Sequence, residues 1–168
     1  MNFWDSKYDQ KDWLYGQEPN EFLKSQLADL KPGLILLPAE GEGRNAVYAA
    51  SLGWSVWAFD TSAVAQKKAL SLAGSKQLIL RYDLVSVEGF HPGESGFDAI
   101  GLCYAHFEPQ LRRLFFRNLQ DWIVPGGKII LEAFRKDQIH KKSGGPKDLN
   151  LLYSLDDLRK DFNQLHIE

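Results

Sequence analysis

The sequence predicts an α/β fold in which a doubly wound, mostly parallel sheet carries helices on both faces. Short apolar segments alternate with helical patterns along the chain. Residues 33–62 combine an apolar segment, a turn with two glycines, a helical pattern and a second apolar segment that ends on an acid. The crossovers of such a sheet are right-handed. A chain of 168 residues is long enough for one well-buried core, so we expect a single domain over residues 1–168.

The apolar pattern predicts five strands and the helices between them. We expect strands over residues 34–38, 54–59, 77–82, 97–103 and 127–134. We expect helices over residues 21–30, 44–52, 62–73, 109–123 and 155–162. Thr61 or Ser62 is the expected N-cap of the third of these helices. Residues 84–96 and 141–147 are expected to be loops, and residues 163–168 to open a further strand.

Composition and charge exclude several classes of function. A net charge of −2 leaves no electrostatic footprint for nucleic acid. No apolar segment approaches the length of a membrane span, and the first residues do not form a secretion signal. Cys103 is the single cysteine, so an internal disulfide is impossible. The histidines share no metal-like spacing, so we expect no metal site. A cytoplasmic protein is the expectation.

The turn after the first strand is typical of a site for an adenosine-containing cofactor. Gly41 and Gly43 allow a sharp turn and a close approach of a ligand to the backbone. The helix that begins near Arg44 directs unpaired N–H groups toward this turn. Asp60 follows Gly41 by about 20 residues, where a carboxylate can accept both hydroxyls of a ribose.

Five segments carry a resemblance to a known family. They are Tyr15-Gly-Gln-Glu-Pro-Asn20, Pro38-Ala-Glu-Gly-Glu-Gly-Arg-Asn-Ala46, Phe59-Asp-Thr-Ser62, Pro125-Gly-Gly127 and Gly144-Gly-Pro-Lys-Asp148. With these segments the chain resembles class I S-adenosylmethionine-dependent methyltransferases, and among them the tellurite-resistance-type enzymes. The resemblance implies a Rossmann-like methyltransferase fold, S-adenosylmethionine as cofactor, and methyl transfer to a small-molecule acceptor such as a chalcogen oxyanion or a thiol.

The chain departs from the pattern of this class at two places. The class usually has an acid near the end of the first strand and a glycine two residues later, whereas this chain has Leu37 and Ala39. Glu40 and Glu42 are candidates to replace the missing acid at the methionine ammonium. The class also ends with an antiparallel pair of strands, and in this chain that C-terminal pair is expected to be incomplete.

The resemblance assigns the cofactor-binding residues. The turn is expected to line the methionine and ribose through Ala39, Glu40, Gly41, Glu42, Gly43 and Asn45. Asp60, followed by Thr61 and Ser62, is expected at the ribose. Asp83 is expected at the adenine amino group, with Leu84 packed against the ring. Tyr104 is expected to flank the sulfonium or the methionine chain.

Two further features each have two readings. Residues 1–32 contain the aromatic side chains Trp4, Tyr8, Trp13 and Tyr15. This segment is expected to be a helical lid over residues 33–168, with Tyr15 near the sulfonium, or a helix packed on the flank of the sheet, and the two interpretations are compatible. His106 is the candidate catalytic residue near the transferred methyl group; the other reading is a structural histidine. The sequence also leaves open whether two copies of the chain form a homodimer.

Two other functions compete with methyl transfer. A non-catalytic cofactor-binding or partner-regulated subunit would explain why Leu37 and Ala39 depart from the pattern. An NAD(P)-dependent oxidoreductase would use Gly41-Glu-Gly-Arg-Asn-Ala46, which also matches Gly-x-Gly-x-x-Ala. Against the oxidoreductase, two acidic residues in the turn would repel a pyrophosphate.

Overall fold

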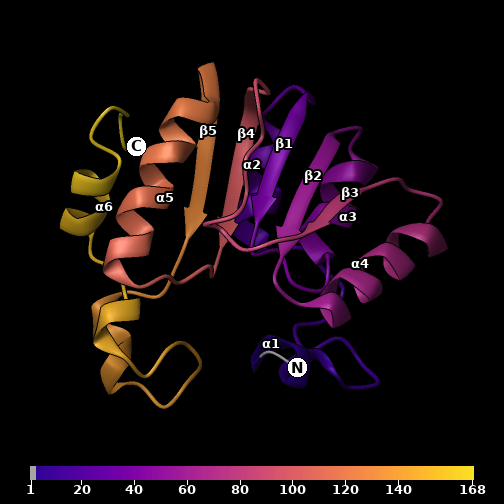
Figure 1. Ribbon diagram of the computed structural model, residues 1–168, viewed down its shortest axis with the longest axis horizontal. Helices are drawn as coiled ribbons and strands as arrows, with labels where there is room; N and C mark the ends of the chain where they lie inside the picture. Colours follow the sequence, from indigo (N-terminus) through magenta and orange to yellow (C-terminus); the bar gives the residue numbers. More distant parts are fainter. Residues whose placement is uncertain (1–2) are drawn as a thin grey trace.

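Five parallel strands form one sheet in the order β3-β2-β1-β4-β5 (Figure 1). The structure is a computed structural model that describes residues 3–168. The strands are β1 (Leu34–Pro38), β2 (Ser55–Asp60), β3 (Arg81–Leu84), β4 (Phe97–Cys103) and β5 (Ile123–Glu132). Strands in the middle of a parallel sheet are covered on both faces, which is why β1 is apolar throughout. The predicted fold class is confirmed.

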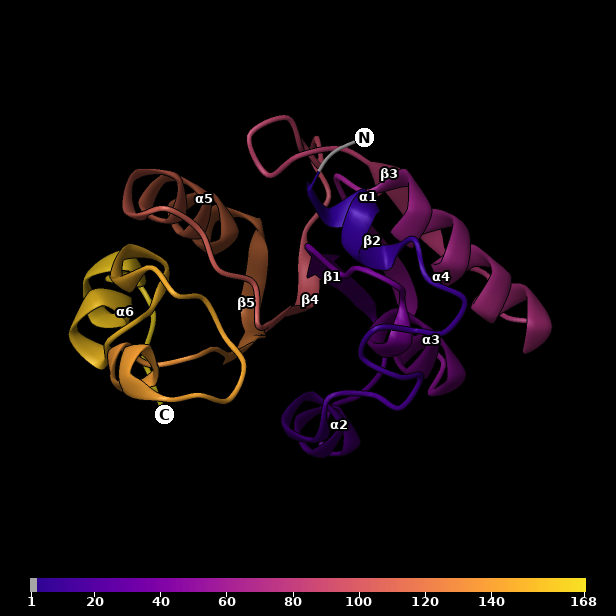
Figure 2. The same ribbon diagram turned by 90° about the horizontal axis from the view of Figure 1, so that it is seen from below.

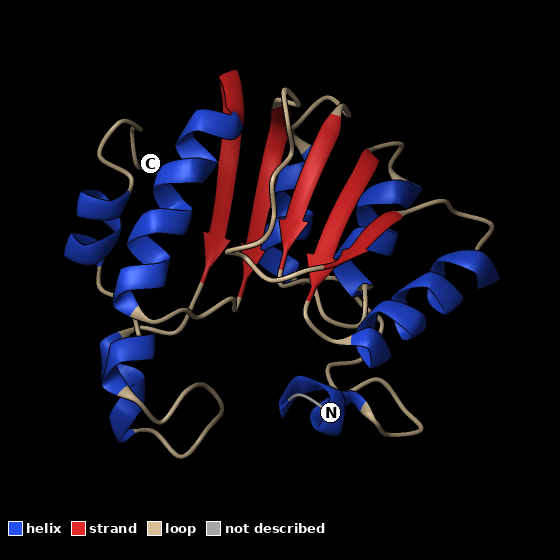
Figure 3. Cartoon of the chain, viewed as in Figure 1, coloured by secondary structure: helices blue, strands red, loops and turns tan. Residues whose placement is uncertain are grey.

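Helices cover both faces of this sheet, as Figure 2 shows from the carboxyl ends of the strands. One face carries α2 (Glu21–Ala28), α3 (Arg44–Ser51) and α4 (Ala63–Ser75). The other face carries α5 (Pro109–Trp122) and α6 (Leu155–Asp161). The remaining helical pieces are the short α1 (Phe3–Tyr8) and two 3-10 turns, Lys136–His140 and Leu149–Leu151 (Figure 3).

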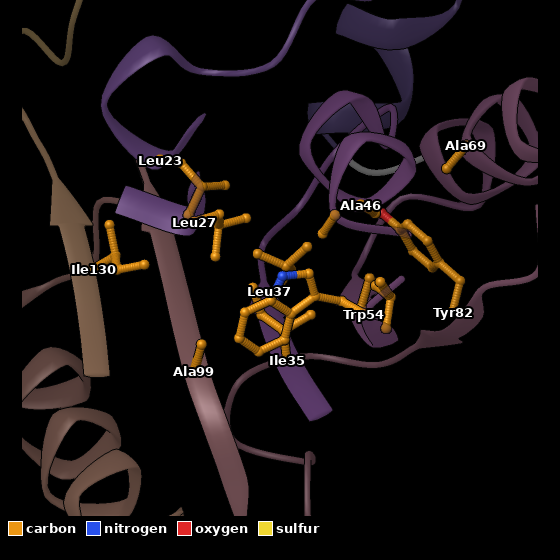
Figure 4. Close-up of a cluster of buried hydrophobic side chains, with 13 residues drawn as sticks. Leu23, Leu27, Ile35, Leu37, Ala46, Trp54, Ala69, Tyr82, Ala99 and Ile130 are labelled. Carbon is orange, nitrogen blue, oxygen red and sulfur yellow. The ribbon is translucent and has the colours of Figure 1, made fainter. Parts of the chain in front are cut away.

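The core on the α2–α3–α4 side explains one departure from the expected pattern. Leu37 is fully buried in it and lies among aliphatic and aromatic neighbours (Figure 4). A carboxylate at this position would have to lie in an apolar environment. The core on the opposite side is aromatic, and Phe90 from the loop before β4 stacks on Phe59 at 4.2 Å. The predicted loop over residues 84–96 therefore covers part of the sheet itself.

The structure differs most from the sequence prediction at β3, at β5 and at the end of the chain. β3 begins at Arg81 because Gln77 has a left-handed φ of 56° and Ile79 is 91% exposed, outside the sheet. β5 begins at Ile123, before the Pro-Gly-Gly segment, and its register with β4 shifts between Phe97 and Ala99. Residues 163–168 form a turn and irregular chain, so the expected strand opening there is wrong.

The sheet has its topological switch point between β1 and β4. β1 pairs with β2 on one side and with β4 on the other, so the connections that leave β1 and β4 run to opposite faces. Open α/β sheets bind ligands in the crevice outside the carboxyl ends of such strands. α1 and residues 141–148 also lie at this end of the molecule (Figure 1). Among residues 3–168, no helix combines the length and hydropathy needed to cross a bilayer.

Candidate functional site

The turn after β1 is held in a left-handed conformation at three positions. Ala39, Gly41 and Gly43 have φ values of 49°, 64° and 86°. A Cβ atom on Gly43 would lie 2.4 Å from the Cβ of Ala69, so this glycine lets α3 pack closely against α4. A Cβ atom on Gly41 would lie 2.7 Å from the Tyr8 hydroxyl. Gly43 therefore serves packing inside the fold, and Gly41 borders the N-terminal helix.

Asp60 ties this turn to the end of β2. Its carboxylate accepts a hydrogen bond from the Gly41 N–H at 3.0 Å and another from the Ser62 N–H at 2.9 Å. The side chain is buried, and this burial raises the pKa of Asp60. Ser62 is the N-cap of α4, since its hydroxyl accepts from the Ala65 N–H, and Thr61 is exposed. The Tyr82 hydroxyl donates to the Gly41 carbonyl at 2.5 Å, which fixes the turn from a second side.

Glu40 lies in the wall of a cavity of about 30 Å³ at the carboxyl edge. The other lining residues are Tyr8, Tyr15, Gly16, Gly41, Glu42 and Arg44. The Glu40 carboxylate accepts from the Ala46 N–H at 2.8 Å and from Asn45 Nδ2 at 3.3 Å, and both donors are neutral. Burial raises the pKa of Glu40 to about 7. Glu40 has no ion-pair partner among residues 3–168.

Glu42 and Asn45 contact the N-terminal segment instead. Glu42 forms an ion pair with Lys68 Nζ at 2.7 Å and accepts the Leu14 N–H at 2.7 Å. Asn45 Oδ1 accepts the Asn20 N–H at 2.8 Å. Arg44 also contacts this segment, through the carbonyl oxygens of residues 15 and 18. Of the two acids proposed to meet a ligand ammonium, Glu40 is therefore the one that forms no ion pair within the described residues.

Replacing Glu42 with glutamine should loosen the N-terminal segment. The change removes the negative charge from a buried ion pair and leaves Lys68 without its partner, so the expected loss of stability is about 1–3 kcal/mol. Amide hydrogen exchange measures the effect, and exchange at Leu14 is expected to accelerate more than exchange in β1. Equal exchange at Leu14 in both proteins would show that this contact does not hold the segment.

Asp83 and Leu84 lie at the end of β3. The Asp83 carboxylate accepts from the Trp57 indole N–H at 2.7 Å and from Arg81 at 3.4 Å. The Arg81 guanidinium stacks on the Trp57 ring at 3.3 Å. Leu84 is 51% exposed and therefore accessible to a flat ligand. The adenine contacts of both residues remain predictions.

The loop after β4 brings Tyr104 into contact with Glu132, an acid that the sequence analysis did not identify. Tyr104 has a φ of 54°, and its hydroxyl donates to Glu132 Oε1 at 3.0 Å. Asn20 Nδ2 donates to Glu132 Oε2 at 2.5 Å. Glu132 is the last residue of β5, opposite Cys103 of β4. Glu132 ends the strand only in the structure, because the predicted strand continued to residue 134, so the signal that pointed to Asp60, an acid directly after a strand, does not point to Glu132.

His106 is held by backbone groups on both of its ring nitrogens. Nδ1 lies 2.6 Å from the Leu151 carbonyl oxygen, and Nε2 lies 3.2 Å from the Phe134 backbone nitrogen. This arrangement fits a neutral ring that donates from Nδ1 and accepts at Nε2, and burial lowers the pKa of His106. The geometry favours the structural reading, because neither nitrogen is left for a substrate. A catalytic role of His106 stays a prediction.

The short helix α1 lies across the carboxyl edge, beyond the tips of the strands (Figure 1). Asp5 accepts from the Ser62 hydroxyl at 2.7 Å, at the start of α4. Tyr8 is buried against the glycine turn and stacks on Trp4 at 5.5 Å. Trp13 packs beneath Lys68, whose ammonium is 5.7 Å from the ring. The N-terminal aromatic residues thus both pack on the fold and cover the site.

Comparison with known proteins establishes the fold. No protein-family model matches the chain, and no curated protein matches it in sequence. TehB from Haemophilus influenzae aligns with a TM-score of 0.72 at 15% identity, over 86% of this chain and 50% of TehB. A protein of echinomycin biosynthesis, studied for the conversion of a disulfide bond into a thioacetal group, aligns with a TM-score of 0.71 at 23% identity, over 92% of this chain and 70% of its own.

A third structure is an S-adenosylmethionine-dependent methyltransferase from Clostridium acetobutylicum. It aligns with a TM-score of 0.69 at 14% identity, over 85% of this chain and 77% of its own. The chain therefore has the Rossmann-like fold found in class I methyltransferases, as the sequence predicted. It spans only half the length of TehB.

Proposed function

We propose that this protein is an S-adenosylmethionine-dependent methyltransferase that acts on a small molecule. The observation that carries the proposal is Glu40, an acid without a cationic partner in a cavity beside the glycine turn. Such a carboxylate suits a ligand that brings its own positive charge. The fold likeness to methyltransferases supports the same conclusion. Tyr15 also lines this cavity, and the resemblance to methyltransferases implies a position near the sulfonium for it.

The residues at the carboxyl edge fit this cofactor. Asp60 and the Gly41 turn would hold the ribose, and Glu40 would meet the methionine ammonium. Asp83 with Leu84 would hold the adenine, and Tyr104 would flank the methionine chain. S-adenosylmethionine, when bound, supplies a methyl group on a sulfonium, and its departing thioether needs no acid. The protein's part is to align two reactants and to exclude water.

The N-terminal segment acts in this proposal as a lid. A cavity of about 30 Å³ is far smaller than the roughly 300–1,000 Å³ of typical small-molecule sites, so α1 has to move for a nucleoside to bind. α1 is short, and its polar contact with α4 goes through Asp5. Closure over the bound cofactor would then remove water from the reacting groups.

The two competing functions make different demands on the same residues. An NAD(P)-dependent oxidoreductase would place a pyrophosphate at the glycine turn, where the unpaired acid Glu40 would repel it. A non-catalytic subunit would bind the cofactor and methylate nothing.

Membership of the tellurite-resistance-type subgroup is supported by the five sequence segments and by the fold likeness to TehB. A cytoplasmic location and a homodimer stay predictions.

Calorimetry with the purified chain tests the proposal. We expect it to bind S-adenosylmethionine and S-adenosylhomocysteine, with no heat of binding for NAD⁺ or NADP⁺. Binding to NAD⁺ or NADP⁺ alone would favour the oxidoreductase. Binding to S-adenosylmethionine without transfer of its labelled methyl group to any amine, thiol or oxyanion would favour the non-catalytic subunit.

A further inference from the structure

The charges at the carboxyl edge are unbalanced. Two buried acids have cations, since Glu42 pairs with Lys68 at 2.7 Å and Asp161 with Arg112 at 2.5 Å, whereas the buried Asp60 accepts backbone N–H groups. Glu40 and Glu132 are held by amides, a backbone N–H and a phenol, all of them neutral. Leaving a buried carboxylate without a cation is costly, so a ligand with positive charge is favoured beside Glu40, and the part-buried Glu132 is accessible to a second positive group.

The two acids belong to one chain of hydrogen bonds. Asn45 donates to Glu40 and accepts the backbone N–H of Asn20, whose side chain donates to Glu132. This chain joins the turn after β1 to the end of β5 and therefore crosses the switch point of the sheet. The charge of Arg44 lowers the pKa of Glu40, but its guanidinium donates to carbonyl oxygens of the N-terminal segment and forms no ion pair with either acid.

Aromatic rings form a wall beside Glu132. The Tyr104 ring is 40% exposed and lies 4.8 Å from the Phe134 ring. Gly145 lies directly against Phe134, where a Cβ atom would be 2.9 Å from the ring. Aromatic faces attract cations as well as apolar groups. Because His106 and Gly145 pack against the Phe134 ring, the exposed aromatic side chain next to Glu132 is Tyr104.

We infer that the methyl acceptor is an amine with an aromatic or apolar body, and that Glu132 is a catalytic residue that binds its nitrogen. This inference rests on the proposed methyl transfer and names the acceptor class for it. The acceptor nitrogen forms a bond to the methyl carbon, while the carbon–sulfur bond breaks and its electron pair stays on sulfur. The positive charge moves to nitrogen, and the proton on that nitrogen passes to the Glu132 carboxylate and then to water. Tyr104 and Asn20 are positioning residues.

An amine fits this electrostatic arrangement better than an oxyanion does. With a neutral amine, the positive charge of the sulfonium moves to the acceptor nitrogen, where the Glu132 carboxylate stabilises it, while Glu40 continues to hold the methionine ammonium. An oxyanion would approach two carboxylates. The lysines that could attract an anion, Lys141, Lys142 and Lys147, are exposed, and Lys147 donates to a carbonyl of its own loop. Exposed charges of this kind are screened by salt.

Three probes with the same ring, together with tellurite, test the inference: benzylamine, benzoate and benzyl mercaptan. Ligand-observed NMR measures the binding of the three ring compounds to the full chain saturated with S-adenosylhomocysteine, and tellurite is tested as a methyl acceptor. We expect benzylamine to bind at least fivefold more tightly than benzoate. We also expect Glu132→Gln to bind benzylamine at least fivefold more weakly than the unaltered chain. Tyr104→Phe should weaken benzylamine binding less, and Glu108→Gln, a control at an exposed acid, should leave it unchanged. With labelled S-adenosylmethionine, benzylamine is the expected acceptor.

The outcomes separate this inference from the proposed function. Preferential binding or methylation of benzoate, benzyl mercaptan or tellurite would overturn the amine assignment, as would an unchanged benzylamine affinity in Glu132→Gln that still binds S-adenosylhomocysteine. If Glu132→Gln does not fold, the ranking of the probes by the unaltered chain decides. A chain that binds neither S-adenosylmethionine nor S-adenosylhomocysteine would instead overturn the proposed function.

Discussion

Replacing Asp60 with alanine is expected to weaken binding of S-adenosylhomocysteine more than tenfold and to destabilise the fold by about 3 kcal/mol. The carboxylate accepts the N–H groups of Gly41 and Ser62, and the side chain is 7% exposed. Alanine leaves two buried donors without an acceptor, at about 1–3 kcal/mol each. The glycine turn then loses its connection to β2, and a ribose loses the acceptor of its hydroxyls. Urea unfolding and calorimetry measure the two effects.

A ligand that lacks one ribose hydroxyl separates these two causes. If Asp60 accepts that hydroxyl, the deoxy analogue of S-adenosylhomocysteine binds the unaltered protein more weakly than the parent compound. Asp60→Ala should then bind both compounds equally, because the pairwise interaction is gone. Asp98→Ala is a matched control, since Asp98 accepts the Leu34 N–H at the opposite end of β1. An unchanged dissociation constant for Asp60→Ala would contradict the ribose assignment.

The fold could be predicted because its strands are buried on both faces. Residues 34–38 and 97–103 are nearly continuous apolar segments, and the structure places strands over both ranges. The start of β3 could not be predicted, because Ile79 has the apolar side chain of a strand residue but lies almost fully exposed. The end of the chain was misread for a similar reason, since Leu165 and Ile167 continue an apolar pattern without a neighbouring strand.

The candidate site could be predicted less completely than the fold. Local pattern placed Gly41, Asp60 and Tyr104 at the carboxyl edge, and the structure has them there. It could not show that Glu42 is paired with Lys68, which depends on how α4 packs. It also missed Glu132, because the partner Asn20 lies 112 residues away in sequence. Contacts between distant segments decide which acids are compensated, and no local spacing records them.

Replacing Glu40 with glutamine is expected to change how stability depends on pH. Burial raises the pKa of Glu40 from 4.5 to about 7, so between these values the folded protein holds a proton that the unfolded chain releases. Stability therefore falls as pH rises from about 4.5 through 7, by about 3 kcal/mol for this group. Glu40→Gln has no titrating group at this position. Its free energy of unfolding should therefore increase relative to that of the unaltered protein as pH rises over the same range. Urea unfolding at several pH values measures the difference.

The same change should alter how the cofactor binds. A ligand ammonium beside Glu40 favours the ionised carboxylate, so S-adenosylmethionine should bind more tightly as pH rises through 7, with release of a proton. Calorimetry in buffers of different ionisation enthalpy counts this proton, and Glu40→Gln should abolish its release. Glu42→Gln should keep it, because Glu42 is already paired with Lys68. Equal proton release by all three proteins would show that the cation lies elsewhere on the carboxyl edge.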